Sequence, residues 1–140
     1  MNPIVFKYEV DGDDFTSAGE ASADMKQKLR KMGVNAEYIR RCAICMYEGE
    51  INMVIHANGG VAEIHVSETN VKIILKDSGP GIADIDKAMS EGFSTATNSI
   101  RELGFGAGMG LPNMKKNSDE ILVESVVGVG TTVTMTINLA

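Results

Sequence analysis

The chain has 140 residues, enough for one domain with a buried core, and its 44% hydrophobic and 23% charged content is typical of a globular protein. A net charge of −6 without any basic stretch argues against direct binding of nucleic acid. No run approaches the roughly 18 apolar residues of a membrane span, and the N-terminus lacks the layout of a signal peptide, so we expect a cytoplasmic protein without membrane association.

The first part of the chain predicts one strand and two helices. The strand covers residues 3–10 and ends at Asp-Gly-Asp-Asp. Residues 14–32 carry apolar side chains at helical spacing, and Gly33 is suited to end this helix. Asn35 is suited to cap a second helix that runs to about residue 57, where Asn-Gly-Gly ends it.

The second part predicts strands and short helices around an irregular segment at 91 to about 110. In chain order these are strands over 61–67 and 71–77, helices over 83–89 and 112–118, and strands over 119–127 and 131–139. Apolar residues alternate with threonine along the last strand, which predicts one buried and one exposed face. The order predicts a single α/β (α+β) domain over 1–140, a two-layer sandwich whose mostly antiparallel mixed sheet has helices on one face.

The two cysteines of the chain, Cys42 and Cys45, are three residues apart in the second predicted helix. A structural zinc site needs four ligands, and no second pair exists to complete one. Free cysteine inside a helix packs as a small hydrophobe. We therefore expect a structural role for this pair, with redox sensing as the alternative.

Three polar residues share one side of the second predicted helix. Glu48, Asn52 and His56 follow one another at intervals of four and have isoleucines beside them. Polar groups in an apolar setting need hydrogen bonds or a ligand, because burying them unpaired is costly. The pattern indicates either a binding site or a solvated stripe on a half-exposed helix.

An aspartate followed by Ser-Gly-Pro-Gly ends the strand over 71–77. The strand would hold Asp77 at a fixed point, where its carboxylate can accept a hydrogen bond from an exocyclic amine such as N6 of adenine. Gly81 would leave room for a flat ring against the backbone. A tight turn with a solvated aspartate is the alternative.

Glycine occupies every second position from Gly104 to Gly110, between large apolar residues. This spacing suits close approach of backbone amides to an anion such as a phosphate chain, and a mobile surface loop is the alternative. The stretch is neither a Walker A sequence nor G-x-G-x-x-G, since Met109 and Leu111 stand where the last glycine of the latter belongs. The later stretch GVGTTV at 128–133 predicts a hairpin turn.

Taken in order, E-x-x-x-N, D-x-G-x-G, G-x-G-x-G and G-x-G-T resemble the motifs of the GHKL superfamily, which has the Bergerat ATP-binding fold. The chain is similar over nearly its whole length to the anti-sigma-factor type serine/threonine kinases of bacteria. Within that group, DSGPGIADIDKAMSEGFSTA and GAGMGLPNMKK look most like the stressosome switch kinases.

The resemblance implies a kinase that uses ATP and Mg²⁺ to phosphorylate a serine or threonine of a small antagonist protein. Glu48 would be the general base, Asn52 would bind Mg²⁺ through its side-chain oxygen, and Asp77 would bind N6 of adenine. The other residues implied in nucleotide binding are His56, Gly79, Gly81, Ile82, Gly104, Gly106, Ala107, Gly108, Met109, Gly110, Leu111 and either Thr131 or Thr132. A sigma factor or another regulator would be a further partner, and residues 3–7 with the first helix are a candidate homodimer surface.

Several side chains keep more than one interpretation. His56 fits a phosphate or Mg²⁺ site and equally a hydrogen-bonded core position. Lys115 and Lys116 either neutralise phosphate charge or lie on the surface, and Arg101 is a conjectural substitute for an arginine that some relatives have on the first helix. Glu50 points about 200° away from Glu48 around the helix, so we do not expect it in the same site.

Two other functions fit the same motifs. In the first, the protein is a nucleotide-dependent binding module without kinase activity, in which ATP or ADP selects the partner. In the second, it is a detached catalytic domain of a histidine kinase, which the lack of a separate dimerising helical region disfavours.

Overall fold

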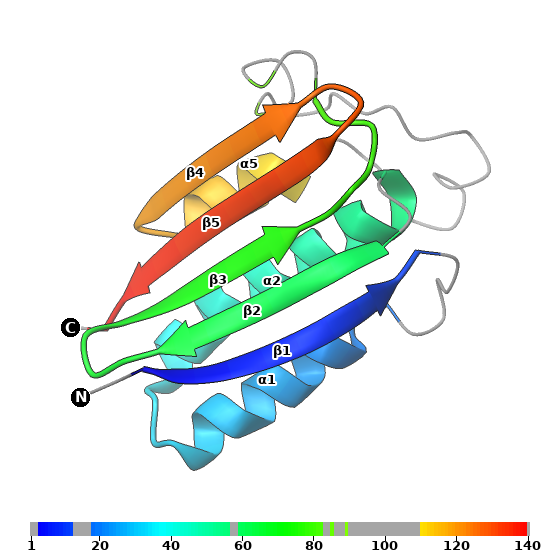
Figure 1. Ribbon diagram of the computed structural model, residues 1–140. Helices are drawn as coiled ribbons and strands as arrows, with labels where there is room; N and C mark the ends of the chain where they lie inside the picture. The colour runs from blue at the N-terminus through cyan, green and yellow to red at the C-terminus, as the bar shows by residue number, and fades with distance from the viewer. Residues whose placement is uncertain are drawn as a thin grey trace.

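The computed structural model of the protein describes residues 3–12, 18–56, 59–82, 85, 89 and 110–139. Within them, five strands form one sheet in the order β1-β2-β3-β5-β4, and every neighbouring pair is antiparallel. Three helices cover one face of this sheet (Figure 1). The expected two-layer α+β sandwich is confirmed, and the described pairings are antiparallel throughout.

The elements follow the predicted order. In chain order they are β1 (Ile4–Asp11), α1 (Glu20–Lys31), α2 (Ala36–His56), β2 (Gly59–Val66), β3 (Asn70–Lys76), α5 (Gly110–Asn117), β4 (Glu120–Val126) and β5 (Gly130–Asn138). The helix expected over 83–89 falls mostly outside the described residues. Across the described ranges, no helix has the length and apolar character needed to cross a membrane.

Two helix starts differ from the prediction. α1 begins at Glu20 rather than near residue 14, and Gly19 before it has a φ of 100°, which a right-handed helix does not allow. α5 begins at Gly110, so Pro112 is its third residue. A proline is tolerated there because the first backbone N–H groups of a helix have no partner within the helix.

Local signals end α1 and begin α2 as predicted. Gly33 has a φ of 83°, and its N–H donates to the carbonyl of Arg30 while the N–H of Val34 donates to that of Leu29. This pair of bonds closes a helix C-terminus in the Schellman manner. The side chain of Asn35 accepts a hydrogen bond of 2.9 Å from the N–H of Glu37, so Asn35 caps α2.

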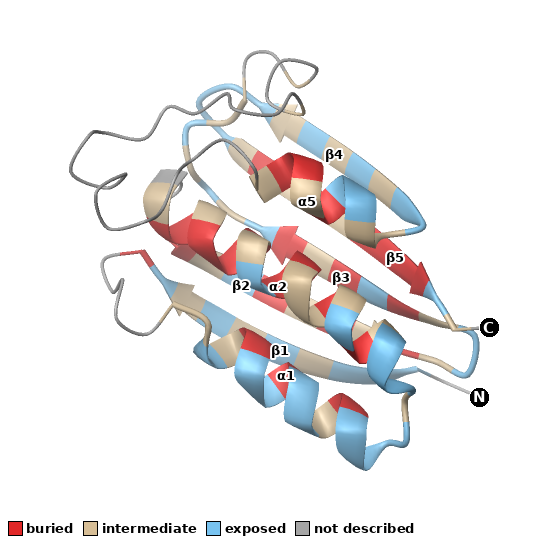
Figure 2. Ribbon diagram, turned by 180° about the vertical axis from the view of Figure 1, so that it is seen from behind, coloured by how far each residue is buried: buried red, intermediate tan, exposed pale blue. Residues whose placement is uncertain are grey.

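The core lies between the sheet and the three described helices, with α2 over its middle (Figure 2). Val71, Ile73 and Leu75 of β3 point toward the helices and are buried. A methyl group at Gly49 of α2 would overlap the side chain of Leu75. Gly49 therefore allows α2 to lie directly on β3, with Glu48 and Glu50 on either side of the contact.

Both cysteines belong to this core. Cys42 and Cys45 are free and fully buried, and the Sγ of Cys45 donates to the carbonyl of Met114 at 3.6 Å. Burial raises the pKa of each thiol to about 12. Because the thiolate is the reactive form, neither cysteine has the character of a redox sensor. The structure supports the structural role that the sequence indicates.

Candidate functional site

Glu48 lies on the side of α2 that faces α5. Its Oε1 accepts a hydrogen bond of 3.2 Å from the side-chain amide of Asn113. The carboxylate is half-buried, and this burial raises the pKa of Glu48, whereas the bond from Asn113 lowers it. Glu48 is therefore held by a donor in surroundings that increase its proton affinity, which suits a general base.

Asn52 follows one turn later on α2 and lies against the first residue of α5. A methyl group at Gly110 would lie 2.8 Å from Oδ1 and 2.9 Å from Nδ2 of the Asn52 side chain. Only glycine permits this approach, which brings the amide of Asn52 next to the N-terminus of α5. The side chain of Leu111 is buried in the core, so its backbone is the part that can face a ligand.

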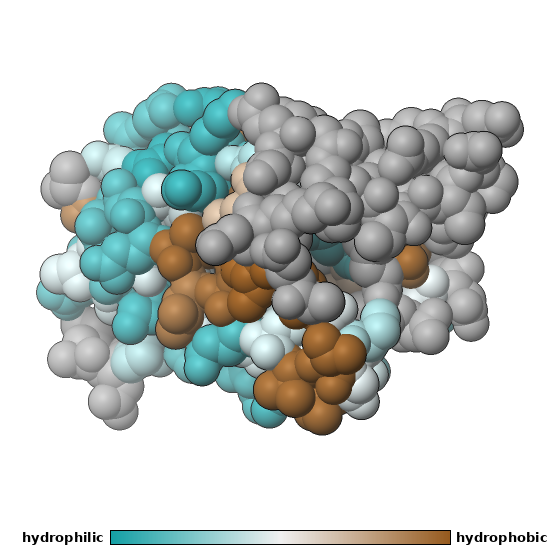
Figure 3. All heavy atoms as spheres, turned by 90° about the horizontal axis from the view of Figure 1, so that it is seen from above, coloured by the Kyte–Doolittle hydropathy of each residue, from teal (hydrophilic) through white to brown (hydrophobic). Residues whose placement is uncertain are grey.

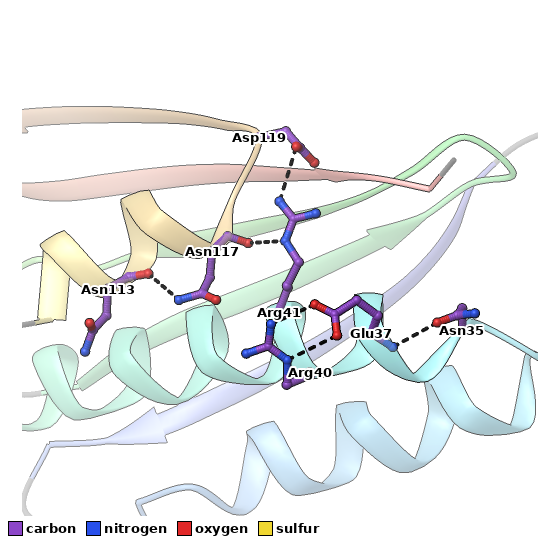
Figure 4. A network of polar contacts seen from close by, with 7 residues as sticks. All are labelled: Asn35, Glu37, Arg40, Arg41, Asn113, Asn117 and Asp119. Carbon is purple, nitrogen blue, oxygen red and sulfur yellow. Dashed lines mark hydrogen bonds and ion pairs between the residues drawn. The ribbon is translucent and has the colours of Figure 1, made fainter.

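The opposite end of α5 is fixed to the first half of α2 (Figure 4). Nε of Arg41 donates to the carbonyl of Asn117 at 3.1 Å, and the same guanidinium is 3.2 Å from Oδ1 of Asp119. The side-chain amide of Asn117 donates in turn to the carbonyl of Asn113 at 2.9 Å. The two helices are thus antiparallel neighbours joined by polar contacts near both ends.

Asp77 follows the last residue of β3 and organises the loop after it. Its Oδ1 accepts hydrogen bonds from the N–H of Gly79 at 2.9 Å and of Thr131 at 3.2 Å. No donor among the described residues bonds Oδ2. A methyl group at Gly60 would lie 2.7 Å from Sδ of Met53 and 3.2 Å from Cβ of Asp77, so this loop lies beside the C-terminal half of α2.

The sequence left Thr131 and Thr132 as alternatives beside Asp77. Thr131 is buried on the helix-covered side of β5, and its hydroxyl is 2.8 Å from that of Ser125. Thr132 has the opposite parity on the strand and pairs with Lys76. Thr131 is therefore the threonine that reaches the Asp77 loop.

The backbone requires glycine at position 81, for a reason that the sequence did not indicate. Its φ is 79°, and a methyl group on it would lie 2.6 Å from the carbonyl oxygen of Val126. The N–H of Ile82 donates to Oγ of Ser125 at 2.7 Å, so the loop is fixed on the β4–β5 hairpin. Hydrophobic surface follows β4 and this hairpin turn (Figure 3), with exposed side chains at Leu122, Val126, Val127 and Val129.

Part of the expected site lies outside the described residues. This holds for Gly104, Gly106, Ala107, Gly108 and Met109, for Arg101, and for the side chain of His56. Lys115 and Lys116 are described, and both are exposed in the last turn of α5. That turn is the far end from Gly110, which favours the surface interpretation of the two lysines.

Glu50 has a role that the sequence did not reveal. It points away from Glu48 as expected, but the residue is only 2% exposed. Its carboxylate accepts bonds from the N–H groups of Gly19, Ala21 and Ser22 at 3.0, 3.3 and 2.6 Å. These N–H groups belong to the start of α1, which has no side-chain cap of its own. Burial raises the pKa of Glu50, and the bonds from these N–H groups lower it.

We expect Glu50→Ala to lower the free energy of unfolding by about 1–3 kcal/mol, because it leaves buried N–H donors without an acceptor. Urea unfolding followed by circular dichroism measures the change. Glu63→Ala, on the open face of the sheet, is the matched control and is expected to change stability by less than about 0.5 kcal/mol. Equal stabilities of the two variants would contradict the capping role.

The fold and these residues define an ATP-binding domain of the GHKL class. Residues 40–140 match the family model described as "Histidine kinase-, DNA gyrase B-, and HSP90-like ATPase". The chain belongs to this family of ATPases. The match includes α2 from Arg40 onward and every later described element, and therefore all of the residues discussed above for the site.

Similar proteins with assigned names show which members of the family this chain resembles. The chain is 48% identical over 61 residues to serine/threonine-protein kinase RsbT of Bacillus subtilis, a match that covers 44% of this chain and 40% of RsbT. It is 36% identical over 117 residues to the anti-sigma F factor of Thermoanaerobacter sp. strain X514, covering 84% of this chain and 70% of that protein. The resemblance to anti-sigma-factor type serine/threonine kinases is confirmed.

A solved structure shares the fold. It contains the RsbU and RsbW domains of a Mycobacterium tuberculosis protein and aligns with a TM-score of 0.67 at 17% sequence identity. The alignment covers 97% of this chain and 32% of that one. At this identity the likeness concerns the fold alone.

Proposed function

We propose that the protein is a serine/threonine kinase of the partner-switching type, which transfers the γ-phosphoryl group of ATP to a small antagonist protein. The observation that carries the proposal is the Glu48 carboxylate, half-buried, bonded to Asn113 and one helical turn from Asn52. Such transfer requires mainly positioning and electrostatic stabilisation, to which a base is added. Membership of the ATPase family and the similarity to RsbT support the choice.

Glu48 would accept the proton of the attacking serine or threonine hydroxyl. A general base is most effective when its pKa is closer to the working pH than that of a free carboxylate. Burial of Glu48 changes its pKa in that direction. The carboxylate would be ionised before the reaction and would be held toward the substrate by the bond from Asn113.

Asp77 would accept a hydrogen bond from N6 of adenine. Its Oδ1 is already bonded to two backbone N–H groups, so Oδ2 is the oxygen available for the base. The N-terminus of α5, which has no acidic residue in its first turn, would receive the phosphates. Gly104, Gly106 and Gly108 would add backbone amides to the same phosphate site.

Asn52 fits Mg²⁺ through the chemistry of its side chain. Mg²⁺ prefers oxygen ligands, keeps several waters, and is commonly held by one or two protein groups together with nucleotide phosphates. Oδ1 of Asn52, next to the start of α5, is such a group. Bound there, the ion would neutralise phosphate charge during transfer.

The partners are proposed from the relatives. The similarity to anti-sigma F factors suggests that a sigma factor or a related regulator binds in addition to the antagonist substrate. β1 is an edge strand of the described sheet, and Ile4 and Val5 on it are exposed. Residues 3–7, at the start of this strand, together with α1 remain our candidate surface for a homodimer.

Calorimetric titration of ATP, with and without Mg²⁺, tests the nucleotide site. We expect the wild-type protein to bind ATP more tightly with Mg²⁺ present, and Asn52→Ala to lose most of this difference because it removes the proposed ligand. Asn70→Ala, at the opposite end of β3, is the matched control and should keep it. Absence of ATP binding by the wild-type protein would overturn the proposal, and binding without transfer to any antagonist would favour a nucleotide-dependent binding module.

A further inference from the structure

The seam between α2 and α5 contains more than the residues proposed to act on ATP. From one end to the other it includes the Arg41–Asn117 bond, the bond from Cys45 to the carbonyl of Met114, the Asn113–Glu48 bond and the Asn52–Gly110 approach. On α2 these residues are spaced by four, three and four positions, so they share one face of the helix. The seam therefore connects the proposed base to both ends of α5.

We propose that Asn113 is a positioning residue for phosphoryl transfer, which holds the Glu48 carboxylate in the orientation that accepts the substrate proton. This inference rests on the proposed kinase function. The side-chain amide of Asn113 is the donor that contacts this carboxylate in the described part of the chain, at 3.2 Å. A glutamate side chain has several rotatable bonds, and one directional hydrogen bond restricts the carboxylate to a small set of orientations.

The backbone around Asn113 is itself restrained. Its carbonyl accepts the bond from Asn117, and the carbonyl of Asn117 accepts the bond from Arg41, whose guanidinium also pairs with Asp119. The other end of α5 is in close contact with Asn52 through Gly110. Asn113 therefore acts from a helix that is fixed at both ends, as a positioning group requires.

The same geometry connects the base with the phosphate site. α5 begins at Gly110, where its N-terminus would receive the phosphates, and Asn113 lies one turn further along. Any movement of α5 on nucleotide binding would move the donor that holds Glu48. Asn113 thus connects the orientation of the base with the position of the helix whose N-terminus is the proposed phosphate site.

The test compares Asn113→Ala and Asn113→Asp with the wild-type protein in steady-state transfer to an antagonist protein. We expect Asn113→Ala to lower kcat roughly tenfold, because it removes about one hydrogen bond to a charged group. The KM for ATP should stay nearly unchanged. Asn113→Asp should lower kcat further, because it places a second carboxylate against Glu48. Ser118→Ala, which removes a side-chain bond to the carbonyl of Met114 on the same helix, is the matched control and should keep the wild-type kcat.

A ¹³C NMR titration of the Glu48 carboxyl supplies a readout that does not depend on catalysis. Without the donor, the pKa of Glu48 is expected to rise in Asn113→Ala and to rise further in Asn113→Asp. Cys45, the titratable neighbour of Glu48 on α2, has its pKa raised to about 12 and stays neutral over this range. A melting temperature near that of the wild type would show that the variants remain folded.

The outcomes separate the inference from the proposed function. A wild-type enzyme that phosphorylates its partner, with unchanged kcat and unchanged Glu48 titration in both Asn113 variants, would overturn the inference and leave the kinase proposal intact. A wild-type protein that binds ATP but phosphorylates no antagonist would overturn the kinase proposal and, with it, the role of Asn113 in transfer. A lower kcat together with the rise in the pKa of Glu48 would establish the inference.

Discussion

Glu48→Gln is expected to lower the rate of phosphoryl transfer by about 10²–10⁴-fold, the usual contribution of a general base. Glutamine keeps the size of the side chain and can still accept the bond from Asn113, but it cannot take a proton from the substrate hydroxyl. ATP affinity should stay near the wild-type value, because Glu48 is not among the groups proposed to bind the nucleotide. Single-turnover transfer from radiolabelled ATP to the antagonist protein measures the effect.

The raised pKa of Glu48 determines the direction in which the rate of phosphoryl transfer changes with pH. Burial raises the pKa of Glu48, so we expect the wild-type rate to fall with decreasing pH at a higher pH than an ordinary glutamate would give. A raised pKa also means that the stability contributed by protonated Glu48 is present at low pH and is lost as pH rises through the raised value. The Gln variant should show neither change.

Glu37→Gln is the matched control for this experiment. Glu37 belongs to the same helix, but it lies in the first turn and pairs with Arg40 in solvent. We expect the transfer rate and the pH profile of Glu37→Gln to match those of the wild-type protein. If Glu48→Gln transferred phosphate as fast as Glu37→Gln, another group would have to be the base.

Asp77→Asn is expected to weaken ATP binding about 100-fold or more, which corresponds to about 2.7 kcal/mol. The two backbone N–H groups that donate to Oδ1 of Asp77 would donate in the same way to the side-chain carbonyl oxygen of asparagine. Its NH₂ group would then take the place of Oδ2 and meet the amino group of adenine, so that two donors oppose each other. Isothermal titration calorimetry with ATP and ADP measures the loss.

Asp119→Asn separates this effect from a general effect of removing a carboxylate. Asp119 also accepts a backbone N–H bond, from Asn138 at 2.7 Å, but it lies by Arg41 at the far end of α5. Its substitution should leave ATP affinity unchanged. Wild-type affinity in Asp77→Asn would mean that adenine is bound by other groups.

Much of the fold could be predicted because its determinants are local. Asn35 and the Glu37 N–H that it caps are two residues apart, and Gly33 ends α1 through bonds to the preceding turn. The strands were predicted to within two residues of their ends because side chains alternate between the two faces. The predicted start of α1 was wrong because the side chain that caps this helix, Glu50, belongs to another helix.

The candidate site could be predicted where its motifs are contiguous, and less well where it depends on contacts between elements. The sequence singled out Asp77 and Gly81, yet the close contact of Gly81 with Val126 depends on a hairpin more than 40 residues away. Asn113 was missed because its partner, Glu48, is 65 residues earlier in the chain. Asn113 and Asn117, four positions apart on a short amphipathic helix, were the available signal for a polar seam.

The contact between Gly49 and Leu75 has a consequence for how sequence change in this protein is interpreted. A side chain at position 49 would overlap the buried side chain of Leu75, so that either this side chain or α2 would have to shift, and a shift of the helix would carry Glu48 and Asn52 with it. Displacements of about 1 Å at reacting groups can cost two orders of magnitude in rate. If the helix shifts, a mutational scan would score Gly49 with the proposed site residues, although its place in the fold makes it a spacer between the helix layer and the sheet. The requirement for close packing and the requirement for the proposed activity would then meet at this one residue.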